Sequence, residues 1–239
     1  KSITVALAGN PNSGKSTIFN NLTGTRQKVG NWPGVTVEKK EGHITTNGYQ
    51  LTVVDLPGTY SLTAYTIEEI VARNFVLDER PDVVVDILDA SNLERNLYLA
   101  TQLRELDTKV VFVLNMADLA GQRGAKIDGD KLSELLDVPV VFTVGNRNKG
   151  TQDLLKTIIS VAEADIELPR TRRVYYGKDI EKAINELSEF IREKSSTELP
   201  YHIRWIAIKL LESDRIVKER VLEFTNPNGE AILQQAELQ

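Results

Sequence analysis

The stretch GNPNSGKS, residues 9–16, decides the fold of this 239-residue chain. It follows the apolar run at residues 3–8, which has the pattern of a buried strand, and residues 17–22 continue it as a helix. Glycine at both ends lets the backbone curl so that successive N–H groups point inward, and the helix start adds partial positive charge. The pattern is rare by chance between a strand and a helix, so the stretch is predicted to be a phosphate-binding P-loop.

Two side chains of this loop carry the expected chemistry. Lys15 is predicted to bridge the β- and γ-phosphate oxygens of a nucleotide as a mobile positive charge. The hydroxyl of Ser16 is predicted to ligate Mg²⁺, a hard cation that prefers oxygen ligands and keeps several waters. The sequence therefore predicts a nucleotide bound together with Mg²⁺.

A second motif, DLPG at residues 55–58, begins at the end of the apolar run at residues 51–55. Asp55 is predicted to hold Mg²⁺ through a bound water, and the Gly58 amide to bond the γ-phosphate only while that phosphate is present. Taken alone, four residues of this kind fit an ordinary turn equally well. The P-loop upstream and the strand that precedes the motif favour the nucleotide site.

A third motif, NMAD at residues 115–118, follows the apolar run at residues 110–114. A carboxylate at Asp118 can accept hydrogen bonds from both N1–H and the N2 amino group of guanine, whereas adenine offers neither arrangement. Asn and Asp three residues apart are common in turns, so it is the order of the three motifs that predicts a preference for GTP over ATP.

Residues 1–165 alternate short apolar runs with amphipathic stretches, which predicts an α/β fold with helices on both faces of a six-stranded, mostly parallel sheet. The strand that precedes Asn47-Gly48 is expected to be antiparallel, because this dipeptide suits a tight hairpin turn. Ser91 and Glu94 are expected to form a capping box for a helix over residues 93–106. The strands are expected at residues 3–8, 43–46, 51–55, 83–88, 110–114 and 139–144.

The strand pattern ends near residue 166, and apolar residues then recur with helical spacing. Residues 166–239 are therefore predicted to form a small all-α domain. Residues 166–178 are expected to connect the two domains, and the basic stretch at residues 170–173 is interpreted as solvated linker in preference to a binding patch.

Composition excludes several kinds of site. A net charge of −5 and a pI near 5.3 give no general attraction to nucleic acid. The chain has no cysteine, and His43 and His202 are its only histidines, so neither a thiolate nor a histidine metal site is expected, and no site for iron. No apolar run approaches the roughly 18 residues of a membrane span. The chain begins at Lys1, and we expect it to be a piece of a longer polypeptide.

The three motifs resemble those of the TRAFAC-type GTPases, and residues 30–38, GNWPGVTVE, narrow the resemblance. With NLERNLYL at residues 92–99, they make residues 2–160 similar to the cytosolic G-domain of the ferrous-iron transport protein B (FeoB) family. The helical segment that follows is similar in kind to the next domain of that family. The resemblance implies a Ras-like P-loop GTPase domain at residues 1–165 and a GDP-dissociation-inhibitor-like helical domain at residues 166–239.

The resemblance also assigns roles to residues of the loop after the P-loop helix. Thr36 would reach Mg²⁺ with its hydroxyl and the γ-phosphate with its backbone. Potassium would be held partly by Asn12 and by backbone carbonyls around residues 30–32, and would stimulate hydrolysis. Trp32 is interpreted as a loop anchor on the core surface in preference to a nucleotide contact. The predicted catalytic residues are Lys15, Thr36, Gly58 and Thr59, and the predicted metal-binding residues are Ser16, Thr36, Asp55 and Asn12.

Three positions depart from common GTPase patterns. Thr59 stands where many small GTPases carry a glutamine that orients the attacking water, so either the Thr59 backbone positions this water or hydrolysis is slow. Met116 replaces a common lysine, and its thioether can cover the base without adding charge. Val-Gly-Asn at residues 144–146 falls where relatives carry Ser-Ala-Lys or Ser-Ala-Arg; the Gly145 amide could bond guanine O6, but the missing hydroxyl predicts weak GDP retention. The residues predicted to bind the nucleotide are Gly9, Asn10, Asn12, Ser13, Gly14, Lys15, Ser16, Thr17, Asn115, Met116, Asp118, Val144, Gly145 and Asn146.

The resemblance implies the GTP-hydrolysing regulatory part of a ferrous-iron transporter, dependent on Mg²⁺ and stimulated by K⁺, at the cytoplasmic face of the cell membrane. A membrane-embedded iron-transport domain is expected C-terminal in the same polypeptide, and assembly into a homo-oligomer stays open. Two alternatives remain. One is a ribosome- or RNA-associated GTPase, which the acidic charge disfavours; the other is a nucleotide-dependent binding module with negligible hydrolysis, for which Thr59 is the best argument.

Overall fold

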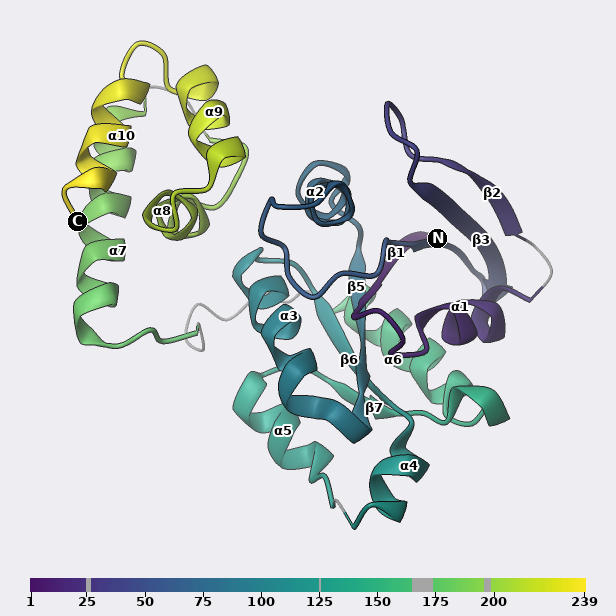
Figure 1. Ribbon diagram of the computed structural model, residues 1–239. Coiled ribbons are helices and arrows are strands. Elements are labelled where there is room, and N and C mark those ends of the chain that lie inside the picture. The colour runs from purple at the N-terminus through teal and green to yellow at the C-terminus, as the bar shows by residue number, and fades with distance from the viewer. Residues whose placement is uncertain (25–26, 125, 165–173, 196–198) are drawn as a thin grey trace. The chain divides into compact units, whose positions relative to one another are not determined.

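The computed structural model describes residues 1–24, 27–124, 126–164, 174–195 and 199–239 (Figure 1). The chain divides into two compact units, Lys1–Arg172 and Arg173–Gln239. The domain boundary expected at residue 165, most of the connection expected over residues 166–178 and the basic stretch at residues 170–173 lie outside the described residues, so they stay predictions.

The first unit is built on a seven-stranded sheet in the order β2-β3-β4-β1-β5-β6-β7. Strands β4, β1, β5, β6 and β7 run parallel, and β3 is antiparallel to both β2 and β4. The mostly parallel α/β sheet and the antiparallel hairpin strand are therefore confirmed. The strands are β1 (Ser2–Gly9), β2 (Gln27–Asn31), β3 (Glu38–Thr46), β4 (Tyr49–Asp55), β5 (Val83–Asp89), β6 (Val110–Asn115) and β7 (Val140–Phe142).

The prediction of six strands is wrong by one, because β2 forms an additional edge strand. Every residue of β2 is exposed, and Gly30 pairs with Lys39 of β3 through the backbone. An edge strand that buries no side chain shows no apolar alternation, so its sequence carried no strand signal. Gly30 and Asn31, expected to lie in a loop, thus end a strand that leads into the loop containing Thr36.

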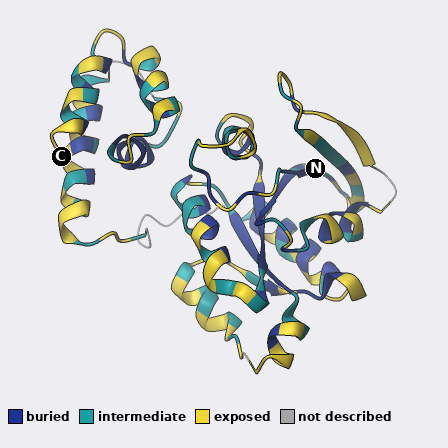
Figure 2. Cartoon of the chain, viewed as in Figure 1, coloured by how far each residue is buried: buried dark blue, intermediate teal, exposed yellow. Residues whose placement is uncertain are grey.

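Helices cover both faces of the sheet, as predicted. The main core lies beneath α1 (Lys15–Thr23) and α6 (Thr151–Glu163), which bury apolar side chains against alternate residues of the strands. Figure 1 shows α3 (Leu93–Glu105) and α5 (Gly129–Leu136) on the opposite side, and Figure 2 shows buried strands between helices with exposed outer surfaces. The other helical elements are α2 (Ile67–Asn74), the π-helical turn η1 (Phe75–Glu79), the 3₁₀ turns η2 (Ala90–Asn92) and η3 (Gly145–Arg147), and α4 (Ala117–Gln122).

The capping box expected at Ser91 and Glu94 is wrong. Ser91 lies in η2, and both its amide and its hydroxyl donate to the carboxylate of Asp89 at 2.8 Å. A capping box is present at α2, where Thr66 and Glu69 bond each other's backbone. The same residue types fit several local bonds, so their spacing alone could not identify the helix start.

The second unit is all-helical in its described residues, as expected. α7, α9 and α10 each bury part of their surface, including Leu187 of α7 and Ile232 of α10, whereas residues 204–210 of α8 are all buried, so α8 is enclosed on all sides. Arg204 is largely buried and donates to both carboxylate oxygens of Glu181, at 2.8 and 2.9 Å, which fixes α8 against α7. The helices are α7 (Lys178–Lys194), α8 (Ile203–Leu211), α9 (Arg215–Phe224) and α10 (Gly229–Glu237). Across the ranges that the structure describes, no helix is both long and apolar enough to cross a membrane.

One buried charge-bearing group stands out in the sheet. Asp86 on β5, an interior strand next to β1, is fully buried between Ala8 of β1 and Phe112 of β6 in the register. Neither carboxylate oxygen has a hydrogen-bond partner among the described residues. Burial alone raises the pKa of Asp86 from 3.8 to about 8, so the folded protein holds this carboxyl in its neutral form at neutral pH.

This raised pKa predicts a pH-dependent cost in stability that Asp86→Asn removes. Between pH 4 and 8 the folded state keeps a proton that the unfolded state releases, so stability falls as pH rises, by up to about 1.4 kcal/mol per pH unit. Urea unfolding at several pH values should show Asp86→Asn gaining stability over the unchanged chain as pH rises from 5 to 7.5. Parallel pH profiles for the two proteins would contradict the neutral carboxyl.

Candidate functional site

The P-loop lies at the carboxyl end of the central strand β1, between Gly9 and the start of α1. The backbone takes positive φ at Asn12 (68°) and Gly14 (89°), and the Ser13 amide donates to the Asn10 carbonyl at 3.1 Å. A Cβ on Gly14 would lie 2.2 Å from Nδ2 of Asn115, a distance that no side chain tolerates. Both its conformation and its neighbour therefore require glycine at this position.

The polar groups of this loop divide into two sets. Asn12, Ser16 and Thr17 are exposed, so their oxygens are open to a ligand. By contrast, Oδ1 of Asn10 and Oγ of Ser13 are buried and have no hydrogen-bond partner among the described residues. Unpaired buried oxygens are costly in a protein interior, and their presence here fits a loop shaped for polar contacts beyond those it makes internally.

The second motif lies beside the P-loop. Asp55 ends β4, and Nζ of Lys15 donates to its Oδ1 in an ion pair whose two side chains are 10% and 8% exposed. Asp55 and the Ser16 hydroxyl supply hard oxygens on neighbouring elements, which fits Mg²⁺ held by few protein ligands together with phosphate and water. No cluster of three or more His, Cys, Asp or Glu that could cage a metal occurs in the described part of the chain.

The segment after Asp55 lies along the P-loop. The Leu56 amide donates to the Leu7 carbonyl at 3.0 Å, and the Thr59 amide to the Gly9 carbonyl at 3.3 Å. A Cβ on Gly58 would lie 3.5 Å from Pro11, so Gly58 sits at van der Waals distance from the loop. Gly58 and Thr59 therefore lie directly beside the P-loop, and their contact with a terminal phosphate stays a prediction.

Asn115 joins the third motif to the P-loop. Its Nδ2 donates to the Ser13 carbonyl at 2.9 Å, and its Oδ1 accepts from the Thr143 hydroxyl and the Gly145 amide, both at 3.0 Å. Thr143 was missed by the sequence reasoning, because a lone threonine at a strand end carries no signal of its own. The Gly145 amide, predicted to bond guanine O6, is engaged by Asn115, so it reaches a base only by sharing or exchanging that bond.

Residues 143–146, which we call the base loop, and the NMAD motif contain the other residues predicted to bind the base, and these lie around Asn115. Met116 adopts a left-handed backbone conformation with φ of 57°, and its Cε lies 3.6 Å from the Cβ position of Gly14. Asp118 lies in the first turn of α4, and its Oδ2 lies 3.9 Å from the guanidinium of the exposed Arg147. Such an exposed pair contributes little, which leaves the carboxylate available to a ligand. Val144 is buried and Asn146 is exposed, and weak GDP retention stays a prediction.

The loop containing Thr36 is held by a backbone hydrogen bond across it and by the Trp32 side chain. The Trp32 amide donates to the Val37 carbonyl at 2.9 Å, and the Trp32 ring packs edge-on to Phe75 at 5.4 Å between centroids. Trp32 is 8% exposed, which agrees with its interpretation as an anchor on the core. Thr36 is exposed, and its hydroxyl makes no hydrogen bond to the P-loop within the described residues.

The close approach of Gly14 to Asn115 predicts that Gly14→Ala destabilises the first unit more than a glycine substitution in open space. The left-handed backbone costs alanine about 1–2 kcal/mol, and the overlap with Asn115 adds about 1–3 kcal/mol. Gly48→Ala is the matched control, because Gly48 has a similar φ of 80° and no atom within 4 Å of its Cβ position. Equal losses in free energy of unfolding for both variants would contradict the tight contact.

Family models and known relatives match both units of the chain. The chain matches the family model described as ferrous iron transport protein B over residues 3–158, and the FeoB cytosolic helical domain over residues 176–239. It is 45% identical over 234 residues to an Fe(2+) transport protein A/Fe(2+) transporter FeoB fusion protein of Porphyromonas gingivalis, covering 97% of this chain and 27% of that protein. It is 43% identical over 220 residues to the Fe(2+) transporter FeoB of Salmonella typhimurium, covering 90% of this chain and 27% of that protein.

Solved structures show the same fold. The cytosolic domain of the T. maritima FeoB iron transporter in a GDP form is 35% identical, with a TM-score of 0.86 over 99% of this chain and 97% of that chain. Its GMPPNP form is 36% identical, with a TM-score of 0.85 over 98% of this chain and 96% of that chain. The chain spans about a quarter (27%) of the length of the curated relatives it matches. It belongs to the ferrous iron transport protein B family and has that family's P-loop GTPase fold.

Proposed function

We propose that this chain binds and hydrolyses GTP as the regulatory part of a ferrous-iron membrane transporter. The observation that carries the proposal is the meeting of three motifs at one edge of the sheet. Lys15 contacts Asp55, and Asn115 bonds the P-loop carbonyl of Ser13. Solved relatives described in GDP and GMPPNP forms support the same ligand class for this chain.

The phosphates would lie in the curl of residues 9–16, where backbone amides and the start of α1 favour negative charge. Lys15 would turn from Asp55 to the β- and γ-oxygens. Mg²⁺ would be held by the Ser16 hydroxyl, by Asp55 through water and by Thr36, and when bound it offsets the charge that develops on the phosphoryl oxygens. Thr36 would reach this position by a movement of its loop, since its hydroxyl is exposed.

Hydrolysis needs a water placed in line with the γ-phosphorus. The water adds to phosphorus, the bond to the β,γ-bridging oxygen breaks, and GDP and phosphate leave. Thr59 offers no side-chain amide and is 5% exposed, so its backbone would place the water. A glutamine and an arginine finger would lower the barrier to hydrolysis further. Without them, we expect this chain to hydrolyse GTP slowly by itself.

The family resemblance points to K⁺ as the cation that assists, held partly by the exposed Asn12. We expect multiple-turnover phosphate release from GTP with Mg²⁺ to be roughly tenfold or more faster in K⁺ than in Na⁺ at equal ionic strength, because a cation beside the phosphates lowers the barrier. Equal rates in the two salts would remove the potassium proposal. No phosphate release in either salt would favour the binding module without hydrolysis.

Asp118 should decide the choice of base. Asp118→Asn loses the carboxylate that accepts from guanine N1–H and N2, so GDP affinity measured by calorimetry should fall by roughly 10- to 150-fold. Asp153→Asn is the matched control, because its side chain is 75% exposed on α6 and far from the three motifs in sequence. If both variants bind GDP as the unchanged chain does, Asp118 does not contact the base.

The wider setting follows from the relatives and is part of the proposal. A membrane-embedded iron-transport domain would lie C-terminal in the full polypeptide, and this chain would act at the cytoplasmic face, with its helical unit influencing GDP release. A homo-oligomer stays open. The RNA-associated alternative is disfavoured by the net charge of −5 and gains no support from the family match.

A further inference from the structure

Helix α3 contacts both segments that would meet the γ-phosphate. Near its start, the Arg95 carbonyl accepts from Nδ2 of Asn10 in the P-loop at 3.4 Å. The Arg95 guanidinium lies over the Tyr60 ring, 4.0 Å from its centroid. Two turns further along, Oε1 of Gln102 accepts from the Leu62 amide at 2.6 Å. One helix thus holds the P-loop and the segment after Gly58 together.

This helix is a firm support because its own start is tied to the sheet. Asn96 is 3% exposed; its Oδ1 accepts from the Asp89 amide at 3.1 Å, and its Nδ2 donates to the Asn92 carbonyl at 2.8 Å. Leu99 and Leu103 are fully buried beneath the helix. Because a buried amide and core packing fix this helix, residues that contact it in a segment without regular structure are held in place as well.

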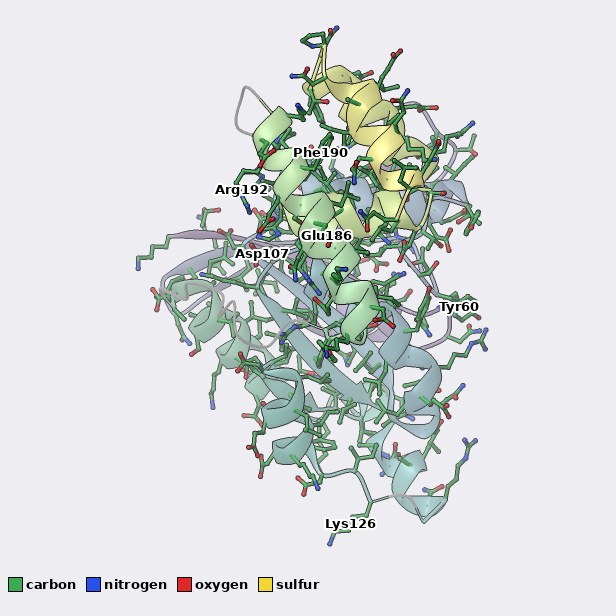
Figure 3. All side chains as sticks on the ribbon, turned by 90° about the vertical axis from the view of Figure 1, so that its left-hand side faces the viewer. Tyr60, Asp107, Lys126, Glu186, Phe190 and Arg192 are labelled. Atoms are coloured by element: carbon green, nitrogen blue, oxygen red, sulfur yellow. The ribbon has the colours of Figure 1, made fainter. Side chains whose placement is uncertain are left out.

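The segment that α3 supports has no regular structure of its own. It lies between the end of β4 at Asp55 and the start of α2 at Ile67. Tyr60 is 41% exposed and projects at the surface (Figure 3), with the Arg95 guanidinium on its ring. Because the neighbouring Thr59 would place the water with its backbone, the position of the peptides at residues 58–60 sets the geometry of attack.

We propose that Arg95 is a positioning residue for GTP hydrolysis, which it serves by stacking on Tyr60 and bonding Asn10 through its carbonyl. The inference rests on the proposed function. The Arg95 side chain acts through Tyr60, because its guanidinium lies over that ring, whereas the bond from Asn10 goes to the backbone carbonyl and stays in every variant. The stack adds to the bond between the Thr59 amide and the Gly9 carbonyl in holding the Thr59 backbone beside the P-loop, and it replaces part of the order that a glutamine side chain would supply.

The test measures single-turnover GTP hydrolysis with Mg²⁺ and K⁺, and GDP affinity by calorimetry. Arg95→Ala should lower the hydrolysis rate by roughly 3- to 30-fold and leave GDP affinity within about twofold, because a cation–π contact is modest but misplaced groups react slowly. Tyr60→Ala should lower the rate equally, and the double variant should fall no further, since both remove the same contact. Tyr60→Phe keeps the ring and should keep the rate.

Tyr98→Ala is the matched control. Tyr98 is an aromatic residue on the same helix, 57% exposed, and its variant should hydrolyse GTP at the unchanged rate. Far-UV circular dichroism and thermal melting check that each variant folds, and Tyr60→Ala tests the proposal if Arg95→Ala fails to fold.

Three results would overturn the inference. Arg95→Ala and Tyr60→Ala could both hydrolyse GTP normally, or their effects could add in the double variant. A loss of about 10³-fold or more for Arg95→Ala alone would mean direct contact with the transition state, as an arginine finger makes. If the unchanged chain binds GTP and releases phosphate, and the variants do so equally well, only this inference fails. If the unchanged chain neither binds GTP nor releases phosphate, the proposed function fails as well.

Discussion

The site depends on the side chain of Asn115, which is 2% exposed and makes three hydrogen bonds. These bonds join Ser13 in the P-loop to Thr143 and Gly145 in the base loop, which lie more than a hundred residues further along the chain. The Oδ1 of Asn115 has two donors, but its Nδ2 has one acceptor among the described residues, so loss of the Ser13 bond would leave a buried amide nitrogen unpaired, which costs more than the bond itself contributes. The phosphate loop and the base loop are therefore held at one spacing by one amide group, and Gly14 must lack a side chain for that group to fit.

The order of the strands explains why three motifs far apart in sequence form one site. β4, β1, β5 and β6 are parallel neighbours, so their carboxyl ends share one edge of the sheet. Gly9, Asp55 and Asn115 each end one of these strands. The sequence could predict this arrangement, because all parallel strands of a sheet end at the same edge. A polar motif that directly follows such a strand must therefore lie at that edge.

Other features could not be predicted, for physical reasons that differ from case to case. β2 buries no side chain, so no apolar pattern marks it. Thr143 and Arg95 contact residues that are distant in sequence, and one threonine or one exposed arginine has no periodic signal. Asp86 breaks the apolar pattern of β5, yet the strand forms because a carboxyl that keeps its proton is far cheaper to bury than a carboxylate.

The ion pair between Lys15 and Asp55 constrains how phosphate and metal enter the proposed site. The two side chains are 10% and 8% exposed, so each depends on the other for charge compensation. A phosphate that draws Lys15 away leaves Asp55 as an uncompensated buried anion, and a Mg²⁺ that engages Asp55 alone stands beside a buried cation. When phosphate and Mg²⁺ bind together, Lys15 pairs with the phosphate and Asp55 with the Mg²⁺, so both side-chain charges stay compensated. In the proposed site, nucleotide and Mg²⁺ would therefore each strengthen the binding of the other, because these two side chains would exchange partners together.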